Sequence, residues 1–83
     1  MRIEVTRDDI ANGHRASAFG CPIALAARRA FPGTNITVTT GRLVVEDKYE
    51  CTTYVLPYDA KEFIRSFDGF RPVLPFVLEV FRR

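Results

Sequence analysis

The sequence predicts a single α+β domain in two layers, with a mostly antiparallel sheet of about five strands and helices on one of its faces. Apolar and polar residues alternate at both ends of the chain and through its middle, which is typical of strands. Two other stretches repeat their apolar residues at helical spacing. The 83 residues suffice for one domain, which at this size buries only about 60% to 65% of the surface of the unfolded chain.

A strand and a short helix are predicted first. Residues 1–6 alternate apolar and polar side chains, as a half-buried strand does. Thr6 is followed three residues later by Asp9, which is the spacing of a capping box. This pattern predicts a helix over residues 8–12 that ends at Gly13.

The main packing helix is predicted over residues 22–31. Pro22 suits its first position, where a missing N–H removes no hydrogen bond. Alanine-rich sequence follows, which favours a helix and allows close approach to a sheet. Pro32 and Gly33 end it.

Three strands are predicted in the middle of the chain, over residues 35–40, 42–46 and 50–56. Gly41 supplies the first turn and residues 47–49 the second. Short connections of this kind join antiparallel neighbours, so these strands form a meander.

A second packing helix and a last strand complete the predicted order β-α-α-β-β-β-α-β. Asp59 and Glu62 have capping spacing, which indicates a helix over residues 59–68 with Gly69 as its stop. Residues 76–81 are apolar and β-prone, and we expect this strand to pair beside the first one.

Composition excludes several classes of protein. The formal net charge is only +2, so a broad attraction to nucleic acid is not expected. No apolar run approaches the length of a membrane span and no signal peptide is evident, which favours the cytoplasm. Cys21 and Cys51 do not form a CxxC pattern, and the chain has a single histidine. We therefore expect reduced thiols, no metal site and no cofactor.

The sheet is expected to carry apolar side chains on both faces, which favours a homo-oligomer, specifically a homodimer. Simple alternation sorts these side chains into two sets: Val44, Tyr54, Val77 and Phe81 on one face, and Leu43, Val45, Val55 and Leu78 on the other.

The stretch GHRASAFGCPI, residues 13–23, connects the first two helices and gathers most of the chemically versatile residues. Free amides at the helix start after Gly20, with Arg15 beside them, are typical of an anion-binding loop. An aromatic ring could stack on a base. The predicted ligand-binding residues are His14, Arg15, Ser17, Phe19, Gly20, Cys21, Pro22 and Phe70.

Catalysis is a competing interpretation of the same stretch. Cys21 at a helix N-terminus could serve as a nucleophile with His14 as its base. No orienting carboxylate is specified near them, so the pattern favours binding, and we assign no catalytic residue. The neighbouring Asp8 and Asp9 are interpreted as solvated charges at a helix start.

Two blocks of the chain resemble a group of small proteins encoded by bacteriophages and prophages. The first is Val5-Thr6-x-x-Asp9-Ile10-x-x-Gly13-x-Arg15-x-Ser17-x-x-x-Cys21-Pro22-Ile23-Ala24-Leu25-Ala26. The second is Phe63-Ile64-Arg65-Ser66-Phe67-Asp68 followed by Pro72-Val73-x-Pro75-Phe76. The resemblance implies a phage source and a role inside an infected bacterium, without a defined activity.

These observations lead to a small non-enzymatic binding protein as the expected function. Its ligand would be an anionic small molecule, such as a signalling nucleotide sequestered to evade antiphage defence. The alternatives are a protein that inhibits or regulates a host factor, and, less favoured by the mixed charges, a small nucleic-acid-binding protein.

Overall fold

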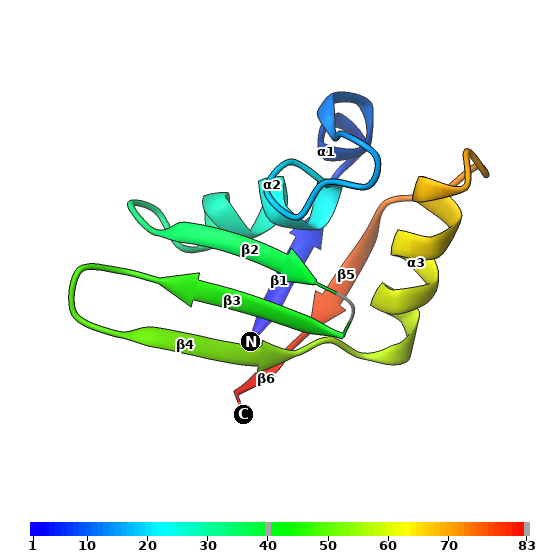
Figure 1. The fold of residues 1–83 in the computed structure, drawn as a ribbon. Helices are drawn as coiled ribbons and strands as arrows, with labels where there is room; N and C mark the ends of the chain where they lie inside the picture. The colour runs from blue at the N-terminus through cyan, green and yellow to red at the C-terminus, as the bar shows by residue number, and fades with distance from the viewer. Residues whose placement is uncertain (40, 83) are drawn as a thin grey trace.

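The computed structural model describes residues 1–39 and 41–82, and it confirms the α+β class and the predicted order of elements (Figure 1). The predicted strand end at Thr40 lies outside the described residues. The helices are α1 (Arg7–Asn12), α2 (Pro22–Ala30) and α3 (Tyr58–Asp68). The strands are β1 (Arg2–Val5), β2 (Asn35–Thr39), β3 (Arg42–Glu46), β4 (Cys51–Val55), β5 (Phe76–Glu79) and β6 (Phe81–Arg82).

The strands form two antiparallel sheets where the sequence predicted one. The first pairs β1 with β5, and the second has the order β2-β3-β4-β6. The predicted last strand is divided at Val80, whose N–H donates to the carbonyl of Met1 over 2.9 Å. The chain leaves β1 after this bond and continues along β4. Figure 1 shows the paired β1 and β5 running across the direction of the larger sheet.

The faces of β4 differ from the sequence prediction. Four residues connect β3 to β4, and the resulting register places Tyr54 opposite Leu43 and Val55 opposite Arg42. Paired residues share a face, so Tyr54 lies on the inner side with Leu43, and Val55 lies on the outer side. The Tyr54 ring packs 5.5 Å from the ring of Phe31. Simple alternation assigned these two side chains to the wrong faces because it ignored the length of the turn.

One apolar core lies between the sheets and the helices. α2 packs against β1, β2 and α1, and its buried alanines permit this close approach. α3 reaches the core through larger side chains, since Phe63 lies 6.2 Å from Phe67 and 4.9 Å from Phe76 between ring centres. In Figure 1, α3 stands beside β5, on the side opposite α2.

The helix starts agree with the prediction at α1 and α2 and differ at α3. Thr6 and Asp9 form the expected capping box. The N-cap of α3 is Pro57, without a side-chain bond, so the predicted cap at Asp59 is wrong by two residues. The carbonyl of Pro57 accepts from the N–H groups of Ala60 and Lys61. The helix therefore begins at Tyr58, one residue before the predicted range 59–68. No helix in the described part of the chain is long and apolar enough to cross a membrane.

Candidate functional site

The connection between α1 and α2, residues 13–21, is attached to the C-terminal end of α3. Arg15 donates from Nε to the carbonyl of Phe67 over 3.1 Å. The N–H of Ala16 donates to Oδ1 of Asp68 over 2.9 Å. A cation suits this end of a helix, because its last carbonyls lack partners within the helix and carry partial negative charge. The Ala16 N–H instead pairs with a carboxylate.

Arg15 is also held by two aromatic rings. Its guanidinium carbon lies 5.0 Å from the centre of the Phe67 ring and 4.2 Å from that of Phe70. Both distances are within the range of a cation–π contact. Within residues 1–39 and 41–82, the two Nη atoms of Arg15 donate no hydrogen bond. The guanidinium is therefore held by the hydrogen bond from Nε and by the two aromatic rings. Its two Nη atoms remain available to donate to a ligand.

The backbone at Phe70 has an unusual conformation. α3 ends with N–H bonds from Phe70 to the Phe67 carbonyl, 3.2 Å, and from Arg71 to the Ser66 carbonyl, 2.8 Å. This arrangement requires a left-handed residue, which is most often glycine. Here Phe70 takes that role with a φ of 62°, while the neighbouring Gly69 has a φ of −86°. The Phe70 side chain remains 76% exposed.

The rest of the connection is held by hydrogen bonds within it and by hydrogen bonds from β2 and α2. The His14 N–H donates to the Gly20 carbonyl over 2.7 Å, and the Gly20 N–H donates to Ser17 Oγ over 2.9 Å. The carbonyl of Ala18 accepts from the N–H of Val38 in β2 over 2.8 Å. Phe19 accepts at its carbonyl from Arg28 and exposes 63% of its side chain. The Gly20 amide proposed for an anion thus already has an internal partner.

Cys21 and Pro22 form the start of α2. The Sγ of Cys21 accepts from the N–H of Ala24 over 3.4 Å, which caps the helix. Cys21 is only 4% exposed, and burial raises the pKa of its thiol. A raised pKa disfavours the thiolate that a nucleophile requires. Pro22 is buried as the first residue of α2, against Gly13.

Asp9 has a structural role that the sequence interpretation missed. Its side chain is only 5% exposed and accepts from both Nη atoms of Arg29 over 2.8 Å, whereas we expected a solvated charge. The hydrogen bond with Arg29 holds the pKa of Asp9 below its ordinary value. Because Arg29 also donates to the Glu4 carbonyl over 2.8 Å, the pair ties α1, α2 and β1 together.

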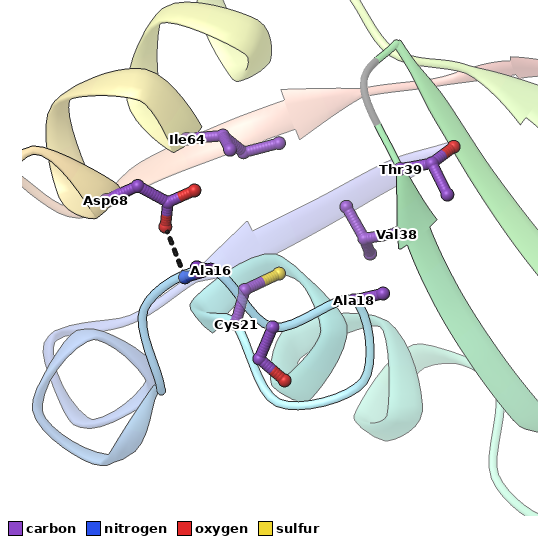
Figure 2. A pocket seen from close by; sticks show the side chains of 8 residues that line it. Ala16, Ala18, Cys21, Val38, Thr39, Ile64 and Asp68 are labelled. Carbon is purple, nitrogen blue, oxygen red and sulfur yellow. Dashed lines mark hydrogen bonds between the residues drawn. The ribbon is translucent and has the colours of Figure 1, made fainter.

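Two hollows that share Ile64 and Asp68 lie beside α3, and together we call them the α3 groove. One hollow, of about 290 Å³, lies between α3, the loop 16–18 and the end of β2 (Figure 2). Figure 2 shows Ile64 and Asp68 on the α3 side, facing Val38 and Thr39 of β2. A second hollow, of about 410 Å³, shares Ile64 and Asp68 and is lined further by Gly41, Lys61 and Arg65.

The structure brings together only part of the predicted set of ligand residues. Arg15 and Phe70 are in contact, and His14, Ser17 and Gly20 are joined within the loop. Sequence reasoning missed the groove along α3, including Lys61, Ile64 and Asp68, because the loop 16–18 and the end of β2, which form its opposite wall, are distant in the sequence. The described residues contain no cluster of three or more metal-ligating side chains.

No protein-family model matches this sequence, and the searches of curated proteins and of solved structures also return no match.

Proposed function

We propose that this protein acts by binding another protein, without catalysis, and that Phe70 lies at the centre of the contact. The observation that carries this proposal is the left-handed backbone of a 76% exposed phenylalanine beside a glycine that does not take that conformation. Strained backbone that the surrounding structure enforces is found preferentially at functional positions.

The energetics within the folded chain give little reason for a phenylalanine here. A left-handed non-glycine residue costs about 1–2 kcal/mol, and an exposed cation–π contact, such as that between Arg15 and Phe70, contributes about 0.5–1 kcal/mol. Burial of the ring against a partner would add about 1.5–3 kcal/mol. The side chain gains most of its possible stabilisation only in a complex.

The surroundings of Phe70 suit a protein interface. Leu74 is also 76% exposed, and Pro72 and Pro75 restrict the backbone of this segment. Arginine and aromatic side chains, phenylalanine included, are enriched at interfaces, and the Arg15 guanidinium lies over the Phe70 ring. Because two blocks of the sequence resemble phage-encoded proteins, the partner we propose is a cytoplasmic protein of the bacterial host.

The test compares the wild type with Phe70→Gly as baits in a bacterial lysate. Glycine accepts the left-handed backbone, so the variant removes the ring without straining the end of α3. Phe19→Ala is the matched control, because Phe19 is likewise an exposed phenylalanine. A partner retained by the wild type and by Phe19→Ala but lost with Phe70→Gly supports the proposal. Equal capture by all three baits contradicts it.

A small anionic ligand is the second candidate, favoured by the fixed guanidinium of Arg15. Its Nη donors are oriented without further ordering, which suits bidentate contact with a phosphate or carboxylate. Calorimetry against a panel of signalling nucleotides tests this candidate, with Arg15→Lys as the variant that keeps the charge and loses the fork. No binding at high micromolar nucleotide would reject it.

Self-association is a further proposal, supported by the outer face of the larger sheet. Val55 and Phe81 are paired across β4 and β6 and are 44% and 63% exposed. An exposed apolar pair of this kind favours burial against a second copy. Sedimentation should show a dimer that Phe81→Lys converts to a monomer. A wild-type monomer of 9.4 kDa at high concentration would contradict this.

A further inference from the structure

The α3 groove has opposite charges at its two ends. Lys61, Arg65 and Asp68 lie four and three residues apart along α3, which places them on one face of the helix. At a rise of 1.5 Å per residue, positions 61 and 68 are about 10 Å apart along the axis. Arg65 is paired with Glu62 over 3.2 Å, so Lys61 supplies the cationic end of the groove and Asp68 the anionic end.

The middle of the groove is apolar. Ile64 borders both hollows, and Cys21 and Val38 line the wall next to it. Figure 2 shows Ile64 extending from α3 toward Val38, with the sulfur of Cys21 beside this wall. A ligand with one apolar group between two opposite charges is complementary to this arrangement.

Asp68 retains capacity to bind a cation although it holds the loop. Its Oδ1 accepts from the Ala16 N–H. A carboxylate has two oxygens and about four acceptor sites in all. A lysine or arginine side chain entering the groove can therefore bind Asp68 without displacing Ala16.

We propose that the α3 groove binds an extended peptide segment with the pattern basic-x-apolar-x-acidic, where x is any residue. Alternate side chains of an extended chain point to one face and are about 7 Å apart. The outer two of three inward side chains are therefore about 14 Å apart. The flexible four-carbon side chain of Lys61 can cover the difference from the axial separation of about 10 Å, so the three side chains can reach Asp68, Ile64 and Lys61 in turn. This inference rests on the proposed protein-binding function, and it names the kind of segment that the partner presents.

The test uses synthetic peptides and isotope-labelled protein in the absence of any partner. The probes are acetylated and amidated Lys-Ser-Leu-Ser-Glu and its reverse, because the groove does not fix the chain direction. Amide resonances of Ala18, Thr39 and Gly41, which border the groove, should shift with one of them at about 1 mM peptide. The shifts should shrink with added salt, since charged ends contribute to binding.

Two variants test the charged ends, with one matched control. Lys61→Glu should weaken the better peptide at least about fivefold by opposing its acidic residue. Asp68→Asn keeps an oxygen for Ala16 and should weaken it by a similar factor. Lys48→Glu, at the other exposed lysine of the chain, should leave the affinity unchanged. No shift with either peptide, or equal affinity for Lys61→Glu and the wild type, would overturn the proposal. That failure would leave the Phe70 test intact, because the bait comparison does not use these peptides.

Discussion

The guanidinium of Arg15 lies 4.2 Å from the ring centre of Phe70, a residue far along the chain. Arg15 belongs to the connection after α1, and Phe70 follows the last turn of α3. The contact joins the connection that carries most of the predicted ligand residues to the exposed aromatic side chain. It also keeps the Phe70 ring beside the helix end, and the same guanidinium donates to the Phe67 carbonyl.

Replacement of Arg15 should loosen this attachment. Arg15→Ala removes one hydrogen bond and two cation–π contacts, and we expect a loss of about 1–2 kcal/mol in the free energy of unfolding. Arg7→Ala, at an exposed arginine of α1, should change the free energy of unfolding by less than about 0.5 kcal/mol. Urea denaturation measures both. Equal effects would show that the arrangement at α3 does not depend on Arg15.

Gly13 should tolerate no side chain, because neighbouring atoms leave no room for one, although its backbone conformation would allow it. Its φ is −73°, yet an added Cβ would lie 2.6 Å from the Pro22 ring and 2.9 Å from the Asp9 carbonyl oxygen. Gly13→Ala must displace backbone or a buried proline, so we expect a loss of about 1–3 kcal/mol. Thermal denaturation of Gly13→Ala beside Asn12→Ala, an exposed neighbour, tests this. Equal melting temperatures would contradict the packing described.

Asp9 should make stability depend on pH in the acid range. Its pKa in the folded protein lies below the ordinary value of 3.8, chiefly because Arg29 donates hydrogen bonds to it. The stabilisation is therefore complete above pH 3.8 and is lost as the pH falls through the folded pKa. Asp9→Asn should cost about 1–3 kcal/mol at neutral pH and less in acid. Asp8→Asn is the control, and a wild-type curve parallel to that of Asp9→Asn would refute this role.

The two cysteines should react at very different rates. Cys21 is buried with a raised pKa, and Cys51 is exposed. At neutral pH a thiol reagent should modify one thiol per chain quickly and the second only after addition of denaturant. Mass spectrometry of the digested protein identifies the site. Fast labelling of Cys21 in the native protein would revive its role as a nucleophile.

Local patterns were sufficient to predict most of the fold. The capping box at Thr6, Pro22 at the start of α2 and alternation in the strands depend on neighbouring residues alone, and the structure confirms each. The division of the last strand at Val80 and the inward face of Tyr54 were missed. Both features depend on how strands pair and on the length of the turn between them. The alternation of residues within one strand carries no information about either.

The sequence predicted residues of the candidate site, Phe70 among them, but not the contacts between distant segments. Sequence identified the connection 13–21 and Arg15, but the partners of Arg15 come from α3. Gly69 was expected as the stop of this helix, and the structure places the left-handed residue one position later, at Phe70. Asp9 was assigned to solvent because its partner Arg29 lies twenty residues away. In each case the decisive contact is distant in the sequence.

The central claim is that Phe70 serves a contact with another protein. The most direct test measures the free energy of unfolding and the partner affinity of two variants, Phe70→Gly and Phe70→Ala. Both variants lack the ring, so both should lose partner affinity at least about tenfold. Phe70→Gly should stay within about 1 kcal/mol of the wild type, and Phe70→Ala should be less stable than Phe70→Gly by about 1 kcal/mol because alanine keeps the left-handed strain. A loss of more than about 2 kcal/mol in Phe70→Gly, with partner affinity retained, would contradict the account.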